Sequence, residues 1–400
     1  MSVIDRLKRS VTDRVFDKSI APTVVDNEVY RAVMDSMPTG PMVRARPQKD
    51  GHGLEAGPDL IETLYMLRTG RFGVRNYSPR HAFELWYDDG KIQFRYYAGH
   101  DQLRGRFESQ LTDKYPGTAV EPDTQMFPQI NEGDFVAGAR MNLRKAFWYP
   151  IKVPNGVETF DRDPYGALTS EMVVGDERTP SGETIRSEDA RVLIQVLFRP
   201  AKRSWSQGEG LGKLFGVDCE SKGQELKNGR IKGGIGREMA GEVKIQDASR
   251  KLKQAGELIS KQRGEPGFYA RIRVLAISPY KEVARRRARS VTEVMETYYN
   301  AVTEQGLTTQ PVRGDELTAM LERMACRQLD FSTLGKISAN KTLLTAPEVA
   351  ALAHLPASAE ESQRGISTSN IDWTFAQTSP GLPPDMPSFE PAADGGDARQ

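Results

Sequence analysis

Two lysines follow glycines in a way that resembles a phosphate-binding loop. Such a loop has the pattern G-x-x-x-x-G-K-[ST], in which backbone N–H groups surround phosphates and the lysine reaches them. Lys336 follows Gly335, but Ile337 stands where the pattern requires Ser or Thr, and Asp330 replaces the first glycine. The segment 207–214 fails at the same two positions, with glutamine first and leucine last. We therefore predict that this chain has no nucleotide-hydrolysis site.

Other catalytic patterns are also missing from the sequence. The acid pairs at 88–89 and 360–361 fall in a turn and a loop, and no G-x-S-x-G nucleophile elbow occurs. Four histidines lack metal-ligand spacing, and His354 is expected to be a packed or capping residue rather than a base. Cys219 and Cys326 lie far apart, which argues against a disulfide framework and a cysteine zinc site. We expect no enzyme activity and no cofactor, and we expect a reducing, intracellular compartment.

Composition indicates a globular protein of 400 residues, with 27% charged and 38% hydrophobic residues. The formal net charge is +1, so any nucleic acid or membrane must be met by a local patch. No apolar stretch is long enough to span a membrane. Residues 1–21 have helical amphipathic spacing, which predicts a helix packed on its own domain, with peripheral membrane contact as the alternative. The predicted location is the cytoplasm, with that peripheral contact as a variant.

The elements of the first half follow the order β-α-β-β-α-β. The segments 81–88 and 91–98 alternate in hydrophobicity and are joined by Asp89-Gly90, a strong signal for a β-hairpin. A helix beginning at Pro58 precedes the hairpin, and a helix capped by Asp101 follows it. The first helix is expected to bury three leucines, which are Leu60, Leu64 and Leu67.

The second half repeats this order, with an insertion at 200–266 between its two central strands. The predicted elements are strands at 141–153, 192–198, 268–277 and 307–312, a helix from Asp163 and a long helix over 278–305. The insertion is rich in Gly, Lys and Arg, and its part 236–264 is predicted to be helical. A connection of this length between hairpin strands is usually functional or mobile. The order favours an α+β fold of tandem ferredoxin-like (βαββαβ) units.

The predicted organisation has five parts. They are an N-terminal amphipathic helix and linker at 1–38, a first ferredoxin-like unit at 39–135, a second unit at 136–314, a helical connector at 315–378 and a disordered tail at 379–400.

Basic residues form two local groups, one in the insertion and one on the long helix. The residues that we consider for nucleic-acid contact are Lys222, Lys227, Arg230, Lys232, Arg285, Arg286 and Arg289. Acidic residues such as Glu220 and Glu225 interrupt the first group. The alternatives are a solvated loop and the solvated face of an amphipathic helix.

Several short motifs together resemble a known family. They are YPIKV at 149–153, DPYGALTSEMV at 163–173, RVLIQVLFRPAKRSW at 191–205, GFYARIRVLAIS at 267–278, LLTAPEVAALAHLP at 343–356 and STSNIDW at 367–373. This order resembles the region before the motor domain in conjugative-transfer, type IV secretion ATPases of the HerA/FtsK-like superfamily. The resemblance covers about residues 147–384. Those proteins continue into Walker A and B motifs, whose ATP-binding residues carry over to no position here.

The resemblance implies a role in a DNA-transfer or secretion machine. We therefore expect a non-catalytic interaction and assembly module that docks to a separate P-loop ATPase, with self-association as a further option. The residues expected at that docking site are Thr345, Glu348, His354, Pro356 and Trp373. The alternative function is a nucleic-acid-binding accessory protein that uses the basic insertion.

Overall fold

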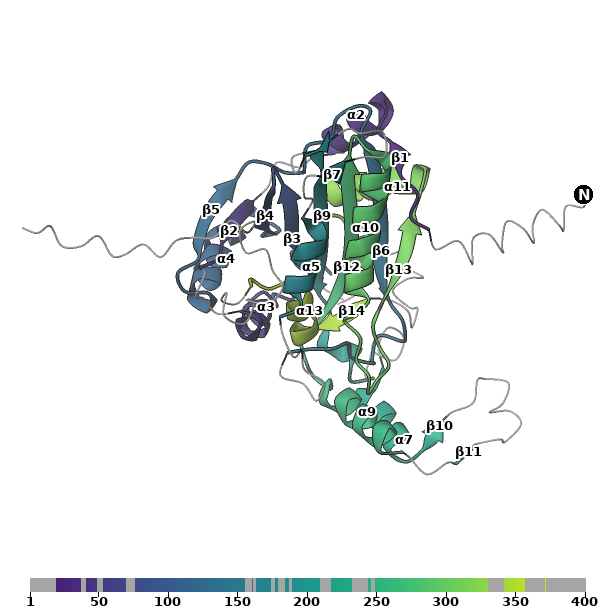
Figure 1. Cartoon of the computed structure of the whole chain (residues 1–400). Helices are drawn as coiled ribbons and strands as arrows, with labels where there is room; N and C mark the ends of the chain where they lie inside the picture. The colour runs from purple at the N-terminus through teal and green to yellow at the C-terminus, as the bar shows by residue number, and fades with distance from the viewer. Residues whose placement is uncertain are drawn as a thin grey trace, which may run out of the picture.

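The computed structural model is an α+β structure built around one large antiparallel sheet (Figure 1). It describes residues 19–36, 41–48, 53–69, 76–154, 160, 163–173, 177–178, 184–186, 189–208, 217–231, 244–245, 249–329, 342–356 and 371. The predicted helix at 1–21 and the predicted tail at 379–400 therefore lie wholly or almost wholly outside the described residues. Within the described residues, no helix combines the length and the apolar character needed to cross a bilayer.

Four strands of the first half form one side of the sheet. They are β2 (Met42–Arg46), β3 (His81–Asp88), β4 (Lys91–Tyr97) and β5 (Ala119–Asp123). Their order across the sheet is β3-β4-β2-β5, and every pair is antiparallel. The predicted hairpin is confirmed: Asp89 and Gly90 join β3 to β4 with φ angles of 49° and 70°. Two successive positive φ angles are typical of the tight turn that matches strand twist.

Four strands of the second half form the other side. They are β6 (Phe135–Leu143), β9 (Arg191–Pro200), β12 (Gly267–Ser278) and β13 (Leu307–Val312), in the order β9-β12-β6-β13. Strands β3 and β9 pair side by side, so the two halves share one continuous sheet. Two short strands extend it: β1 (Thr23–Val24) pairs with β6, and β14 (Leu343–Thr345) pairs with β12.

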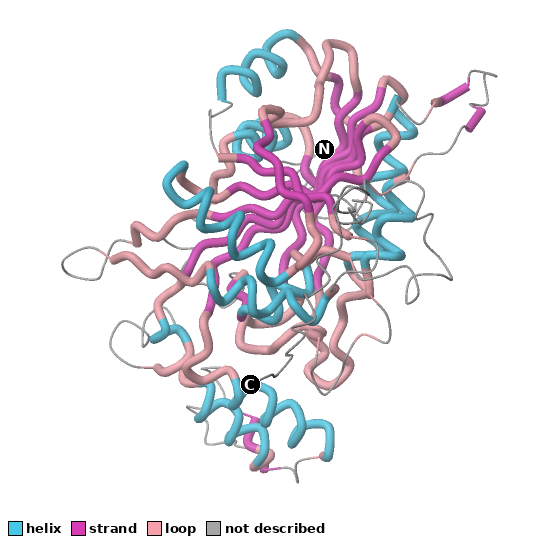
Figure 2. The backbone as a smooth tube through the Cα atoms, turned by 90° about the vertical axis from the view of Figure 1, so that its left-hand side faces the viewer, coloured by secondary structure: helices cyan, strands magenta, loops and turns pink. Residues whose placement is uncertain are grey.

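Helices cover both faces of the sheet, as Figure 2 shows. The main core lies under α3 (Gly57–Thr63), α4 (Asp101–Lys114), α5 (Tyr165–Met172), α10 (Lys281–Met295) and α13 (Ala346–Leu352). The opposite face is covered by α2 (Asn27–Ser36) and α11 (Asp315–Ala325). Strand β3 serves both layers because its side chains alternate: Phe83 and Leu85 enter the main core, whereas Trp86 enters the second core.

Several predicted boundaries are wrong. The aromatic segment 147–149 lies after β6, because that strand ends at Leu143. Helix α3 ends at Thr63, so Leu67 is an exposed residue rather than a core one. Helix α4 is capped by His100, whose ring nitrogen accepts a hydrogen bond from the Gln102 N–H, and not by Asp101. Helix α10 is shorter than predicted, since it ends at Met295.

The insertion folds back on itself as two helices. They are α7 (Cys219–Lys227) and α9 (Arg250–Lys261), and a small ribbon of β10 (Arg230–Ile231) and β11 (Lys244–Ile245) lies between them in sequence. The helical prediction for 236–264 is therefore correct only in its later part, and α7 was missed. A second small ribbon joins β7 (Glu177–Arg178) to β8 (Thr184–Ile185).

Candidate functional site: an interaction arm and its base

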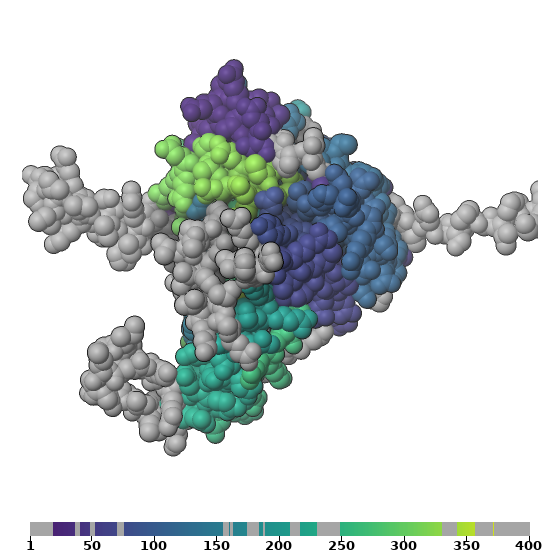
Figure 3. Space-filling model, turned by 180° about the vertical axis from the view of Figure 1, so that it is seen from behind, coloured from purple at the N-terminus to yellow at the C-terminus, as the bar shows by residue number. Residues whose placement is uncertain are grey.

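Helices α7 and α9 form an arm that projects beyond one end of the sheet (Figures 1 and 3). The two helices approach each other closely at Gly223 and Gly256. A Cβ atom on Gly223 would lie 2.4 Å from the backbone oxygen of Gly256, and a Cβ on Gly256 would lie 2.5 Å from that of Gly223. Because real Cβ atoms do not approach backbone oxygens so closely, only glycine permits this contact. The arm is therefore a pair of helices in backbone contact rather than a loose loop.

The base of the arm is part of the main core. Cys219 of α7 and Ile259 of α9 are both fully buried there, beside Trp205. The Trp205 indole N–H donates to the Glu265 carbonyl oxygen at 3.1 Å, which ties both ends of the insertion together. Burial raises the pKa of the Cys219 thiol to about 12. The thiol is therefore protonated at neutral pH and packs among the apolar side chains of the main core.

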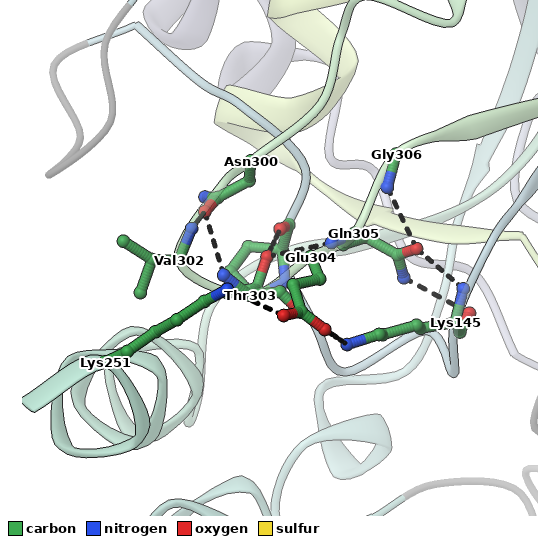
Figure 4. Close-up of polar contacts among 9 residues, drawn as sticks. Lys145, Lys251, Asn300, Val302, Thr303, Glu304, Gln305 and Gly306 are labelled. Atoms are coloured by element: carbon green, nitrogen blue, oxygen red, sulfur yellow. Dashed lines mark hydrogen bonds and ion pairs between the residues drawn. The ribbon is translucent and has the colours of Figure 1, made fainter. Parts of the chain in front are cut away.

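A turn at 300–306 fixes the arm to the body (Figure 4). The Glu304 carboxylate accepts from Lys145 Nζ at 2.8 Å and from Lys251 Nζ of α9 at 2.6 Å. Hydrogen bonds from the two ammonium groups lower the pKa of Glu304 to about 2. The backbone of Glu304 has a φ of 56°, a conformation that non-glycine residues rarely adopt.

Neighbouring amides hold this turn in place. The Asn300 Oδ1 atom accepts from the N–H groups of Val302 and Thr303, both at 3.0 Å. The Gln305 side chain bonds to the backbone of Lys145 through both of its ends. The buried side-chain amides of Asn300 and Gln305 therefore order the turn that presents Glu304 to the two lysines.

The outer side of α9 is predominantly basic. Arg250, Lys253, Glu257 and Lys261 recur at helical spacing and are all exposed. Within the part of the chain that the structure describes, none of these four side chains forms an ion pair. Three cations and one carboxylate are thus left to face the solvent.

The residues predicted for nucleic-acid contact have mixed positions. Lys222 is half-buried and pairs with Glu225 at 3.0 Å, and Lys227 is half-buried with its stem against Gly256. Only the backbone of Arg230 is described, and Lys232 lies outside the described residues.

The three arginines of α10 are exposed together, as predicted. Arg285 pairs with Glu282 at 2.5 Å and Arg289 with Glu293 at 2.7 Å, while Arg286 lies beside them on the surface. Carboxylates on the same helix therefore offset two of these charges, which favours the solvated-face interpretation.

The predicted docking segment lies in the interior. Thr345, Glu348, His354 and Pro356 are all buried, and Trp373 lies outside the described residues. Thr345 caps α13, in a capping box with Glu348. The Glu348 carboxylate also accepts from the Ile151 N–H at 2.9 Å. Burial raises the pKa of Glu348 to about 7, although the hydrogen bonds from Thr345 and Ile151 oppose that rise.

His354 is a packed residue in this structure. Its Nε2 lies 3.0 Å from Asp163 Oδ1, its Nδ1 lies 2.9 Å from the Ala350 oxygen, and its ring stacks on Tyr165 at 3.9 Å. Thr345, Glu348 and His354 therefore hold the chain's own elements together, and Pro356 is buried after them in the chain. In this conformation their side chains are not available to a partner.

A buried polar cluster at the centre of the sheet was not predicted. Arg327, which follows α11, pairs with Glu84 at 3.0 Å, and Gln195 donates to the same carboxylate at 2.8 Å. Arg273 donates to Gln195 at 2.9 Å and to the Gln328 carbonyl oxygen at 2.6 Å. All four side chains are fully buried. The signal in the sequence was a charged or amide residue in the middle of each apolar strand. The cluster clamps the end of α11 to the sheet.

Among the described residues, no group of three or more His, Cys, Asp or Glu side chains is placed to hold a metal ion. The model of a protein family described as a domain of unknown function, DUF8128, matches residues 20–374. The chain therefore belongs to the DUF8128 family. A search of the curated proteins finds no match.

Proposed function

We propose that this chain is a non-catalytic assembly module of a conjugation- or secretion-like DNA-translocation machine, and that its arm docks it to a separate P-loop ATPase. The observation that carries the proposal is the arm itself. Its two helices touch through Gly223 and Gly256, its base lies in the main core, and Lys251 of α9 pairs with Glu304 of the body. A pre-ordered helical element loses little conformational entropy on binding, which favours affinity. The motif order from 149 to 373 supports the choice of machine.

We infer that each half of the sheet is a ferredoxin-like unit. In both halves the second and third strands are neighbours, the first strand follows, and the fourth forms the outer edge. In both halves the two helices that connect the strands contribute to the same main core. This arrangement supports a tandem of two βαββαβ units joined through β3 and β9.

The buried state of the 343–356 segment changes the proposed contact. We place docking on the exposed side of α9 and assign the segment to the support of the arm's base. Both outer strands also carry a proline, Pro122 in β5 and Pro311 in β13. A proline removes a ladder donor and is a common device against strand addition. Docking through helices is therefore favoured over the addition of a partner strand.

The second candidate is nucleic-acid binding by the same basic side of α9. Arg250, Lys253 and Lys261 would meet phosphates, and their spacing along one helix face supports this. Glu257 lies between two of these cations and would repel a phosphate backbone. We therefore rank this candidate second.

The test uses two charge-matched triple variants of the full chain. One carries Arg250→Glu, Lys253→Glu and Lys261→Glu; the control reverses three exposed cations elsewhere, Lys91, Arg106 and Lys281. The probe is the purified P-loop ATPase that is encoded nearest to this gene, and its Kd is measured by biolayer interferometry. We expect the arm variant to lose at least about tenfold in affinity, the equivalent of about 1.4 kcal/mol, and the control to bind normally.

Equal binding by both variants, or no binding by the native chain, would reject the ATPase proposal. A parallel titration with a 30-base-pair DNA duplex separates the second candidate. Binding that weakens steeply with salt, and that only the arm variant loses, would favour nucleic acid instead.

A further inference from the structure

One row of polar residues crosses eight strands of the sheet without a break. From the edge of the first half to the edge of the second it reads Glu121, Arg44, Arg95, Glu84, Gln195, Arg273, Arg140 and Gln310. Each is the direct cross-strand neighbour of the next. Read from the centre outward, both halves give an acid or its amide, then two arginines, then an acid or its amide.

The neighbouring row obeys the same symmetry. In the first half Pro122 faces Val43, Val43 faces Tyr96, and Tyr96 faces Phe83. The matching positions in the second half are Pro311, Ala139, Val274 and Ile194, which are paired in the same order. Each outer strand thus contains an acid or amide followed by proline, as Glu121-Pro122 and Gln310-Pro311.

The junction between the halves has the geometry of a two-fold contact. Strand positions 83 and 194 are equivalent, as are 85 and 196. In the structure Phe83 faces Val196 and Leu85 faces Ile194. Position 83 of the first unit thus faces the equivalent of position 85 in the second unit, and position 85 faces the equivalent of position 83. This reciprocal pairing is the rule for an isologous interface.

The central arginines also have equivalent tasks. Arg95 donates to the Gln125 carbonyl oxygen, in the segment that follows β5. Arg273 donates to the carbonyl oxygens of Arg323 and Gln328, in the segment that follows β13. In each half, the arginine of the third strand holds the chain that leaves the fourth strand.

We infer that the two halves are copies of one ancestral unit, and that this unit paired with a second copy of itself along the edge strand now present as β3 and β9. The natural partner of the edge strand β3 or β9 is therefore a second copy of the same unit. This inference rests on the proposed tandem of two βαββαβ units, but it does not depend on the proposed docking of the arm to an ATPase.

The differences between the copies are as informative as the matches. Two facing carboxylates at the junction would repel each other, and the pair Glu84 and Gln195 avoids this because one position is an amide. Where the first copy has the two-residue turn Asp89-Gly90, the second carries the arm between β9 and β12. The arm is thus an addition to one copy.

Two circular permutants of the full chain test the inference, each with Gln400 joined to Met1. One opens between Glu132 and Gly133, in the connection between the units; the control opens between Asp89 and Gly90, inside the first unit. Both openings lie at surface turns, but the first leaves both units continuous whereas the second divides the first unit. Urea unfolding is followed by tryptophan fluorescence.

We expect the between-unit permutant to unfold within about 0.5 M urea of the native chain, and the within-unit permutant to lose more than about 1 M. A within-unit permutant that is as stable as the between-unit one would overturn the inference. If neither permutant folds, an alignment of DUF8128 members decides. From that alignment, one sequence profile is built for residues 41–123 and one for residues 135–312 without the arm. When the two profiles are aligned, Glu84 must match Gln195 and Arg95 must match Arg273. No match, or a match in another register, overturns the inference as well.

Discussion

The structure contains two buried titratable groups whose effects on stability oppose each other. Burial raises the pKa of Glu348 from 4.5 to about 7 and lowers the pKa of His81 from 6.5 to about 4. Glu348 is 1% exposed and His81 is 2% exposed, so solvent screens neither strongly. Both ring nitrogens of His81 are buried without a hydrogen-bond partner among the described residues. The two groups lie on different elements, α13 and β3, and can be changed separately.

The sign of each effect follows from proton linkage. The folded state holds the proton of Glu348 more tightly than the unfolded chain does. Its contribution is therefore complete below pH 4.5 and is lost as pH rises to about 7. The unfolded chain holds the proton of His81 more tightly, so that contribution is complete above pH 6.5 and is lost as pH falls to about 4. Each of these two pKa changes corresponds to about 3 kcal/mol.

The two slopes have opposite signs between pH 4.5 and 6.5, so their contributions to the native chain nearly cancel there. Glu348→Gln removes the falling contribution, and the free energy of unfolding should then rise by about 3 kcal/mol across that window, relative to the native chain. His81→Leu removes the rising contribution, and its free energy of unfolding should fall by a similar amount. Each variant is compared with the native chain at every pH, so that all other titrating groups cancel.

The assay is urea unfolding at half-unit pH steps from 4.5 to 7.5, read by tryptophan fluorescence. The midpoints and slopes give the free energy of unfolding at each pH. The stability difference between each variant and the native chain is plotted against pH. Slopes of the same sign for the two variants, or no slope for either, would refute the assignment of these buried groups.

Three further predictions concern the arm and the central cluster. Gly256→Ala should separate α7 from α9 and make the arm more sensitive to limited proteolysis. The control Gly105→Ala has open space around its Cβ position in α4 and should raise the free energy of unfolding by about 0.5–1 kcal/mol. Equal protease sensitivity of the two variants would contradict the predicted separation of the helices. Arg327→Met leaves the buried Glu84 carboxylate without its ion-pair partner and should cost about 3–5 kcal/mol in urea unfolding, part of which the added change Glu84→Gln should restore; no recovery would contradict the pairing. Glu304→Gln should increase hydrogen exchange in α9 at low salt, and the difference from the native chain should shrink at 1 M salt, where exposed pairs are screened; a difference that is independent of salt would contradict an ionic tether.

The strands were predictable because alternation leaves a direct trace in the sequence. The predicted positions of β3, β4 and β13 agree closely with the structure. Residues 147–149 misled the prediction for β6, because aromatic side chains also pack well in the turn that follows a strand. Helix α7 was missed because glycine and charged residues dominate it, and its one close packing contact needs a glycine. The packing of α7 against α9, rather than local helix propensity, therefore stabilises this helix.

The candidate site was less predictable than the fold for a physical reason. The segment 343–356 has a motif that resembles that of a known family and so predicts docking, but a motif does not say whether its residues face a partner or the core. Glu348 serves the chain's own backbone, since its carboxylate accepts from Thr345 and Ile151. A buried capping box stabilises its own helix in any protein, so its residues do not by themselves indicate contact with a partner.

The central polar row shows why the inferred internal repeat leaves no clear pattern in the amino-acid sequence. Each copy contributes single residues spaced by unequal loops: Glu84 and Arg95 are 11 positions apart, whereas Gln195 and Arg273 are 78 apart. The arm accounts for most of that difference. A sequence comparison sees only the spacing, but strand pairing restores the match, because a sheet aligns residues by register and not by distance along the chain. The same argument locates the specialised part of the molecule. Both halves contain the polar row, whereas only the second half carries the arm, so the arm is the element most free to serve a partner.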